Sequence, residues 1–347
     1  MDLLNNLALG FAVALTLDNS LYCLLGTLLG TLVGVLPGLG PLATIALLLP
    51  LTYGLEPATA LIMLAGIYYG AQYGGSTTAI LINLPGEVSS VVTALDGHQM
   101  ARQGRAGQAL AVAALGSFFA GCMATLLIAA VAPSMSALAL KFGPAEYCSL
   151  MLLGLVAAVA LAQGSVIKAM AMVLIGLLLG LIGTDVTSGS QRFVFGIPEL
   201  ADGVDFVAVA MGLFGVAEVI RNLETGQADR QVASSAERGL NRWRPPREDC
   251  RRAWRASLRG TALGSLLGVL PGGGAVLASY ASYLLEKKFA REPQRFGHGA
   301  IEGVAGPESA NNAGAQTAFI PMLTLGLPSN PVMALMIGAM TDRKSIV

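Results

Sequence analysis

The chain has 347 residues, of which 54% are hydrophobic and only 12% are charged, and its formal net charge is zero. A soluble domain carries roughly a quarter charged residues, so this composition excludes an ordinary water-soluble globular protein. The balance of charge also gives no indication of a nucleic-acid partner.

Long runs without Asp, Glu, Lys or Arg indicate the class of the protein. A membrane-spanning helix needs about 20 apolar residues, and several runs reach that length. The runs cover residues 19–55, 57–86, 106–140, 147–167, 260–285 and 309–341. We therefore predict an all-α, polytopic integral membrane protein whose main solvent is the lipid bilayer.

Residues 1–96 form the first region, in which glycine and proline interrupt apolar segments. The start, MDLLNNLALG, lacks the basic stretch of a cleavable signal peptide, so we expect the first apolar segment to be an uncleaved anchor. The interruptions are GVLPGLG at 34–40, GAQYGGSTT at 70–78 and NLPG at 83–86.

Residues 97–220 form a central region of spanning helices. We expect plain spans at about 107–131, 145–162, 166–183 and 204–220, separated by Pro133, a turn at 163–164 and a polar stretch at 184–203. Four spans place the loop 97–108 on the same side of the membrane as the region that follows residue 220. The polar stretch 184–203 is then external.

Residues 221–256 form a basic loop. Ten arginines lie between Arg221 and Arg259, against five acidic residues in the same interval. Short loops rich in Lys and Arg remain in the cytoplasm, so we place this loop inside and interpret its arginines as a topology signal. A lipid-binding patch is the alternative.

Residues 257–347 form the last region, which begins with an apolar stretch of only about 30 residues between two basic loops. Two full spans need about 40 residues, so the stretch predicts a re-entrant hairpin that turns at 271–274. Non-helical backbone at membrane depth is tolerated only where it faces protein or a water-filled cavity. The turn is therefore a candidate site.

The last region repeats the pattern of the first. GVLPGGG at 268–274 matches GVLPGLG at 34–40, and it is followed by further interruptions, GPESANN at 306–312 and GLPSNP at 326–331. Interrupted apolar segments at corresponding places in two halves are typical of transporter binding sites. We predict two internal repeats that contain re-entrant or discontinuous helices.

These interruptions suit an anionic ligand. A helix N-terminus presents free N–H donors and a partial positive charge, and the apolar segments contain no cationic side chain other than Lys168. A simple kink in a helix is the alternative. We expect the ligand to be held by backbone amides near Gly38, Gly40, Gly272 and Gly274, supplemented by Ser76, Thr77, Thr78, Asn311 and Asn312.

Two glutamates lie next to interruptions. Glu308 begins a long charge-free stretch, where a carboxylate would coordinate a coupling cation, carry a proton or cap a helix. Glu87 follows the NLPG interruption directly, and we interpret it as a cap or loop residue. Asparagine oxygens nearby could bind Na⁺ or could satisfy backbone groups freed by the breaks; these belong to Asn83, Asn311, Asn312 and Asn330.

Motifs of enzymes are missing from the sequence. His98 and His298 lie in polar, basic loops, and the chain contains no HExxH, GxSxG or phosphate-binding loop. The four cysteines have no metal-ligand spacing. We predict that the chain is not an enzyme and has no cofactor beyond a coupling Na⁺ or H⁺.

Extended motifs carry a family resemblance. They are GVLPGLGP at 34–41, YYGAQYGGSTTAILINLPGE at 68–87, TALDGHQMARQGRAGQAL at 93–110, GPESANNA at 306–313 and LTLGLPSNPVMALMIGAM at 323–340. Together they resemble the large membrane subunit of tripartite tricarboxylate transporters, the TctA family.

The resemblance implies a secondary transporter of the bacterial inner membrane, with an ion-transporter-type fold, that takes up citrate or related carboxylates by using an ion gradient. It also implies two partners, a small four-helix membrane subunit and a periplasmic solute-binding protein. The site residues that match the family motifs are Gly38, Gly40, Ser76, Thr77, Thr78, Asn83, Pro85, Gly86, Gly272, Gly274, Glu308, Ser309, Asn311 and Asn312.

Members of the family continue for several more membrane segments, whereas this sequence stops at TDRKSIV. We therefore expect a truncated or frameshifted C-terminus, which keeps a passive channel or an inactive scaffold subunit open as the alternative function. A membrane-embedded enzyme is a further alternative, and it would need clustered acid, base or metal-ligand residues at membrane depth.

Overall fold

The computed structural model describes residues 3–36, 39–139, 165–185, 190–204, 243–270 and 274–342, with isolated positions between 141 and 159 and between 209 and 223. This part of the chain is all-α, as predicted, apart from two short strands, β1 (Gly183–Thr184) and β2 (Gln191–Arg192). The strands pair antiparallel, with Gly183 opposite Arg192.

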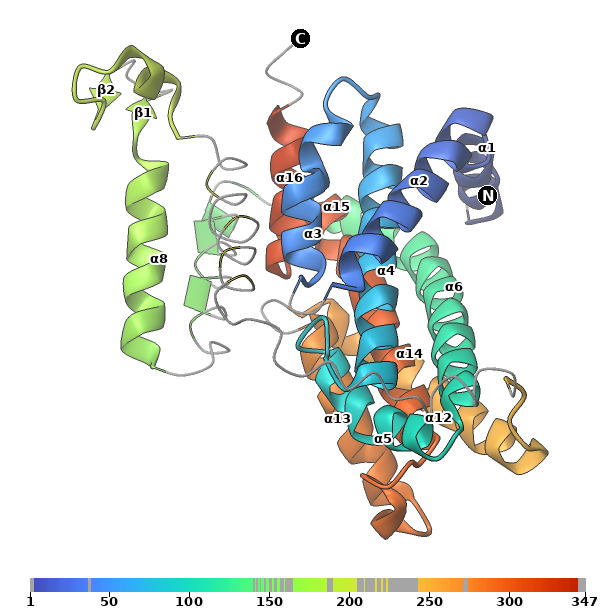
Figure 1. The fold of residues 1–347 in the computed structure, drawn as a ribbon. Helices are drawn as coiled ribbons and strands as arrows, with labels where there is room; N and C mark the ends of the chain where they lie inside the picture. The colour runs from blue at the N-terminus through green and yellow to red at the C-terminus, as the bar shows by residue number, and fades with distance from the viewer. Residues whose placement is uncertain are drawn as a thin grey trace.

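The elements follow one another in two groups, separated by an isolated helix (Figure 1). The first group is α1 (Leu3–Ala14), α2 (Leu17–Gly34), α3 (Pro41–Leu48), η1 (Leu49–Thr52), α4 (Pro57–Ile82), α5 (Ser90–Arg102) and α6 (Ala106–Ala139). Then come α8 (Val166–Gly180) and η2 (Pro198–Asp202). The last group is α12 (Arg247–Gly268), α13 (Gly274–Phe289), η4 (Pro293–Arg295), α14 (Glu302–Thr317), α15 (Phe319–Leu325) and α16 (Pro331–Asp342).

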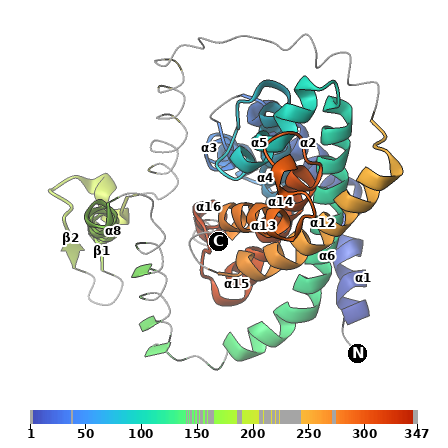
Figure 2. The same cartoon turned by 90° about the horizontal axis from the view of Figure 1, so that it is seen from below.

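Helix α14 lies at the centre of the helical body. It packs against α5 and α6 of the first group and against α12 and α13 of its own group, and Figure 2 shows it enclosed by these helices. Its sequence, EGVAGPESANNAGAQT, consists mainly of small side chains, and nearly all of them are buried. Small residues let several helices approach one axis closely, so α14 brings the two groups together.

Glycines fix the packing of α2 on α4. Gly26, Gly30 and Gly34 repeat at four-residue intervals and therefore lie on one face of α2. A Cβ on Gly30 would lie 2.3 Å from the carbonyl oxygen of Ile67, closer than any real contact. The two backbones meet directly, and these positions of α2 accept no side chain.

The same spacing brings α12 against α14. Gly260, Gly264 and Gly268 also repeat every four residues, and a Cβ on Gly264 would lie 2.3 Å from the carbonyl oxygen of Ala310. Both α2 and α12 end at the last glycine of their series, where the matching GVLP segments begin. The two helix pairs therefore form their contacts by the same device.

Two of the expected interruptions lie inside continuous helices, which corrects the sequence analysis. Residues 70–78 belong to α4 and residues 306–312 belong to α14. The glycines of α4 serve close packing instead, since Gly70 and Gly74 face the carbonyl oxygens of Thr27 and Thr31. The chain turns later, at left-handed residues that end α4 and α15, namely Asn83 (φ 58°) and Gly326 (φ 67°).

The central spans are described in part. Helix α6 continues to Ala139 with Pro133 inside it, beyond the expected end near residue 131. Proline is tolerated within membrane helices because neighbouring groups satisfy the backbone that it frees. Helix α8 occupies most of the expected span 166–183, whereas the expected spans 145–162 and 204–220 fall mostly outside the described residues.

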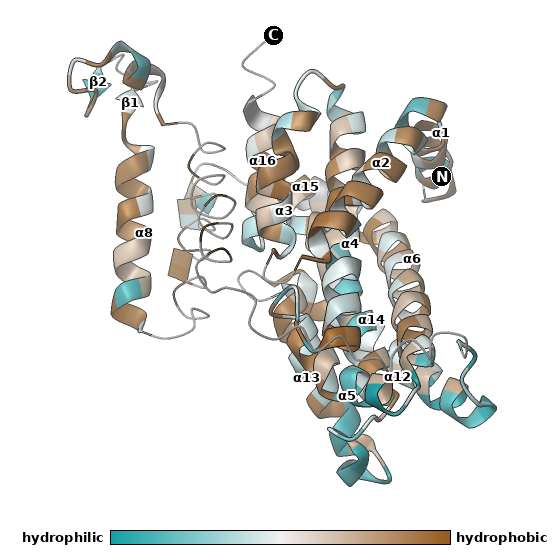
Figure 3. Ribbon diagram, in the orientation of Figure 1, coloured by the Kyte–Doolittle hydropathy of each residue, from teal (hydrophilic) through white to brown (hydrophobic). Residues whose placement is uncertain are grey.

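Apolar surface is exposed on several helices. Within the described residues, two helical segments, Leu17–Gly34 and Ala106–Met135, are long and apolar enough to cross a membrane by length and composition alone. Helix α8 is shorter, lies apart from the helical body in both views, and buries no residue, although it is strongly apolar (Figures 1–3). Such faces would need lipid or another protein to cover them.

Charged residues gather at one end of the body. Hydrophilic positions mark α5, the first turns of α12 and the segment between α13 and α14, at the lower end of Figure 3. The opposite part of the body contains the main apolar core, which joins α3 and α4 to α15 and α16 through buried residues such as Ile67 and Met333. The described helical body is therefore polar at this end and apolar in the part that contains the core.

Candidate functional site

A buried carboxylate joins the two groups of helices. Glu308 lies in the interior of α14, only 3% exposed, so it is not a helix cap. Its Oε1 atom accepts hydrogen bonds from the hydroxyl groups of Ser76 on α4, at 2.9 Å, and Thr93 on α5. Burying a carboxylate is unfavourable unless it is hydrogen-bonded or binds a proton or cation, so this position carries a functional implication.

A second carboxylate, that of Glu87, contacts α14 about one turn beyond Glu308. Asn311 Nδ2 donates to Glu87 Oε1 at 2.9 Å, and Gln72 Nε2 donates to Asn311 Oδ1 at 3.4 Å. Glu87 is in the loop between α4 and α5, directly after the turn that begins at Asn83. The side chain of Asn311 therefore bridges α4 and this loop.

The face of α14 toward α6 is also polar. Asn312 Nδ2 donates to Ser117 Oγ at 2.7 Å. Gly116 of α6 faces Ser309, since a Cβ on Gly116 would lie 2.7 Å from Ser309 Oγ. Ser309 Oγ and Gln72 Oε1 are buried and have no partner among the described residues. Buried polar atoms normally have a partner, so these two atoms are free to bind water or a ligand.

The polar cluster, defined as Gln72, Ser76, Glu87, Thr93, Ser117, Glu308, Ser309, Asn311 and Asn312, offers oxygen atoms and two carboxylates but no cationic side chain. Hard cations prefer such ligands, and a carboxylate can alternatively hold a proton. No group of three or more His, Cys, Asp or Glu side chains suited to a metal occurs in the part of the chain that the structure describes.

Comparison with known proteins shows the family of the chain. A family model described as the tripartite tricarboxylate transporter TctA family matches residues 21–343. The chain belongs to the TctA family. The family is one of transporters rather than enzymes, and "tripartite" means that further subunits exist, so this chain is a membrane transport component.

Two relatives of the TctA-family chain come from Agrobacterium vitis. An uncharacterized 52.8 kDa protein in the TAR-I ttuC' 3' region is 63% identical over 339 residues, which cover 98% of this chain and 67% of that protein. An uncharacterized protein in the TAR-II ttuC' 3' region is 75% identical over 76 residues, which cover 22% of this chain and 31% of that protein. No solved structure matches the chain.

The structure brings some of the predicted site residues of this TctA-family chain together. Ser76, Glu308, Ser309, Asn311 and Asn312 all lie in the polar cluster. Gly40 and Gly86 border it: a Cβ on Gly40 would lie 3.2 Å from the Gly86 carbonyl oxygen and 3.6 Å from Glu87 Cβ. Gly86 in turn packs on the backbone of Gly75.

Other predicted residues lie outside the cluster. Thr77 and Thr78 donate to carbonyl oxygens of their own helix, at Tyr73 (2.8 Å) and Gly75 (3.0 Å). Asn83 is an exposed cap, and Pro85 belongs to the turn that follows it. Gly274 begins α13 on the side of Gly268 and Asn330. Gly38 and Gly272 lie outside the described residues.

Three residues of the cluster, Gln72, Thr93 and Ser117, are not among the site residues predicted from the sequence. Gln72 and Thr93 lie within the quoted family motifs but were not selected, because neither carries a distinctive spacing. Ser117 lies in an otherwise apolar run of α6, where a single hydroxyl resembles a packing residue. For Gln72 and Ser117, the signal available was a polar side chain within a charge-free segment.

Asp96 of the same TctA-family chain anchors the polar end. Its Oδ1 atom accepts backbone N–H groups of Gly297, Gly299 and Ala300 at 2.8–2.9 Å, and its Oδ2 atom accepts the Tyr283 hydroxyl at 3.0 Å. Asp96 is fully buried. Because all its partners lie in the second group of helices, Asp96 fixes α5 relative to the start of α14, and thereby positions Thr93 beside Glu308.

Proposed function

We propose that this chain is the translocating membrane subunit of a binding-protein-dependent secondary transporter that takes up citrate or related tricarboxylates into bacteria. The observation that carries the proposal is the buried Glu308, held by hydroxyl groups from both α4 and α5. Membership of the TctA family supports the substrate class.

Charge neutralisation explains how such a site would couple an ion to an anion. With Glu308 and Glu87 ionised, the polar cluster repels a carboxylate substrate, because like charges in a low-dielectric interior interact strongly. A Na⁺ ion or a proton at Glu308 removes that repulsion. Substrate and cation then bind together more favourably than either binds alone, which is the requirement for symport.

The substrate itself would be bound beside the cluster, by neutral donors. Backbone N–H groups near Gly40 and Gly274, at the starts of α3 and α13, supply partial positive charge without a cationic side chain. We expect Gly38 and Gly272, which lie outside the described residues, to contribute in the same way. Asn311 and Asn312 supply amide donors next to Glu87 and Ser117.

We further propose that residues 1–96 and 257–347 are related halves with discontinuous hairpin helices, joined by the central spans and the basic cytoplasmic loop. The equal glycine spacing of α2 and α12 and the left-handed turns at Asn83 and Gly326 support this architecture. The two halves would move against each other around the polar cluster, in the inner membrane, with the small four-helix subunit and the periplasmic binding protein as partners.

Uptake of labelled carboxylates tests the proposal. Vesicles containing this chain, the small subunit and the binding protein are given Na⁺ and pH gradients separately, with citrate and other carboxylates as substrates. We expect gradient-dependent uptake of at least one tricarboxylate, lost in Glu308→Gln. Downhill flux that ignores both gradients would indicate a passive channel instead, and no uptake of any acid would contradict a carboxylate transporter.

A further inference from the structure

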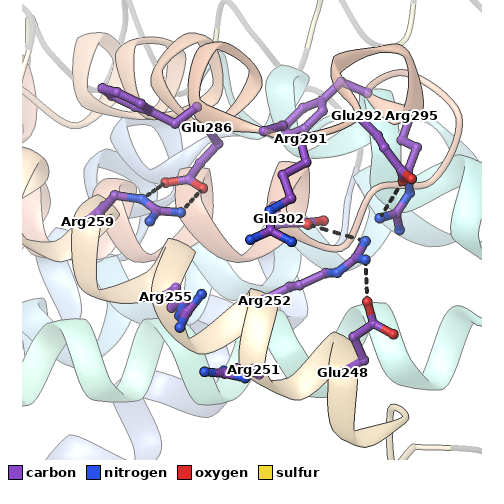
Figure 4. Close-up of a pocket in the computed structure, with 13 residues that line it drawn as sticks. Glu248, Arg251, Arg252, Arg255, Arg259, Glu286, Arg291, Glu292, Arg295 and Glu302 are labelled. Atoms are coloured by element: carbon purple, nitrogen blue, oxygen red, sulfur yellow. Dashed lines mark hydrogen bonds and ion pairs between the residues drawn. The ribbon is translucent and has the colours of Figure 1, made fainter.

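A basic pocket lies at the charged end of the described helical body, along the part of α12 that precedes its glycine series. It has a volume of about 520 Å³ and is formed by the first turns of α12, the end of α13, η4 and the start of α14 (Figure 4). Its charged lining consists of six arginines and four glutamates: Arg251, Arg252, Arg255, Arg259, Arg291, Arg295, Glu248, Glu286, Glu292 and Glu302.

Three of the arginines are occupied by carboxylates. Arg259 donates twice to Glu286, at 2.7 and 2.6 Å, and this glutamate is almost fully buried. Arg252 pairs with Glu248 and lies 3.9 Å from Glu302, and Arg295 pairs with Glu292 at 3.7 Å. These pairs use all four glutamates of the pocket.

The other three, Arg251, Arg255 and Arg291, have no ion-pair partner among the described residues. Arg251 and Arg255 are one helical turn apart on α12, and Arg291 approaches from the end of α13. In Figure 4 the Arg291 guanidinium lies between the Arg259–Glu286 pair and the Arg252–Glu302 pair. Burial raises the pKa of Glu302 above its ordinary value, and the neighbouring Arg252 opposes this shift.

Exposed aromatic side chains lie close to the pocket. Trp254 lies on α12 between the two unpaired arginines and is 51% exposed, and Phe289, at the rim, is 66% exposed. Beyond Arg259, α12 carries no charge up to its end at Gly268. Tryptophan at the boundary between a charged and an apolar helix segment is typical of the level of lipid headgroups.

We propose that this pocket binds a phosphate group through Arg251, Arg255 and Arg291. Guanidinium groups match phosphate oxygens with paired, charge-assisted hydrogen bonds, and basic pockets beside membrane helices bind anionic headgroups. The phosphate would come from an anionic phospholipid or from a soluble phosphate. This binding role adds to the topology signal that the sequence predicts for the arginines of residues 221–256, and it is independent of the transported substrate.

The test compares two variants of the full chain with equal loss of charge. The pocket variant carries Arg251→Gln, Arg255→Gln and Arg291→Gln. The control variant carries Arg102→Gln, Arg244→Gln and Arg247→Gln, which lie outside the pocket. Thermal unfolding verifies that both variants fold. If the pocket variant does not fold, the single change Arg291→Gln, at an exposed position, replaces it in the binding measurement.

Binding is measured with vesicles of phosphatidylcholine alone, vesicles that also contain phosphatidylglycerol, and inorganic phosphate in detergent. We expect the pocket variant to lose on the order of a hundredfold in affinity, and the control variant much less. Preference for phosphatidylglycerol with no binding of inorganic phosphate identifies the lipid as the source, and the reverse identifies a soluble phosphate. The proposal would be overturned by equal losses in both variants. It would also be overturned if the unmodified chain neither preferred phosphatidylglycerol nor bound inorganic phosphate.

Discussion

Ser76 and Glu308 are separated by 232 positions in the chain, yet the Ser76 hydroxyl donates to the Glu308 carboxylate at 2.9 Å. This single bond joins α4 to α14 at the most buried acidic side chain of α14. The same Glu308 oxygen also accepts a hydrogen bond from the Thr93 hydroxyl, so α4 and α5 both hold this carboxylate. Because the bond connects the two groups of helices, its removal should affect stability and transport together.

Replacing Ser76 by alanine tests this bond. Hydrogen bonds to charged groups contribute roughly 1.5–3 kcal/mol, so Ser76→Ala should lower stability by about 2 kcal/mol and reduce carboxylate uptake severalfold. The matched control is Thr77→Ala, because the Thr77 hydroxyl bonds only to its own helix. Thermal unfolding and vesicle uptake are measured for both, and equal behaviour of the two variants would contradict a special role for Ser76.

Variants of the two residues in the Glu87–Asn311 contact separate the effect of charge from that of hydrogen bonding. Glu87→Gln keeps an oxygen that accepts from Asn311 and removes only the charge, whereas Asn311→Ala removes the donor. We expect Glu87→Gln to fold normally but to need a higher concentration of the coupling cation, and Asn311→Ala to lose stability as well. Glu56→Gln, at an exposed position, is the control. An unchanged cation dependence in Glu87→Gln would remove Glu87 from the coupling site.

Asp96 should be the most sensitive residue at the polar end. Asp96→Ala leaves three backbone N–H groups and the Tyr283 hydroxyl without an acceptor, and each such buried group costs about 1–3 kcal/mol. Tyr283→Phe removes one of the four bonds and should cost about 1 kcal/mol. Thermal unfolding in lipid discs ranks the two, and a loss in Asp96→Ala no larger than in Tyr283→Phe would show that the contacts are incidental.

The glycine series can be tested at one position in each helix pair. Gly30→Ala and Gly264→Ala each place a Cβ 2.3 Å from a carbonyl oxygen of the facing helix, so each should destabilise by about 1–3 kcal/mol. Gly121→Ala on α6 is the control, because nothing lies within 4 Å of a Cβ there. That change should be neutral or stabilising by up to about 1 kcal/mol. Similar melting temperatures for all three variants would contradict this prediction, because they would mean that the paired helices move apart at little cost to accept a Cβ.

The sequence by itself determined the class and the family. Charge-free runs predict an all-α membrane protein, and the extended motifs identify the TctA family, because both depend only on residue types and their order. The repeated GVLP segments predict two related halves, and this stays a prediction. The interpretation of 70–78 and 306–312 as interruptions was wrong, since glycine serves close helix packing as readily as it breaks a helix, and only the facing backbone distinguishes these roles.

Tertiary structure alone decided which polar residues meet. Ser76, Thr77 and Thr78 look equivalent in the sequence, but successive residues point about 100° apart around a helix, so only Ser76 faces Glu308. The partners of Asp96 and the placing of Arg291 in one pocket with Arg251 and Arg255 also depend on segments that are distant in the chain. Local pattern specifies each helix and its faces, whereas contacts between distant helices specify the site.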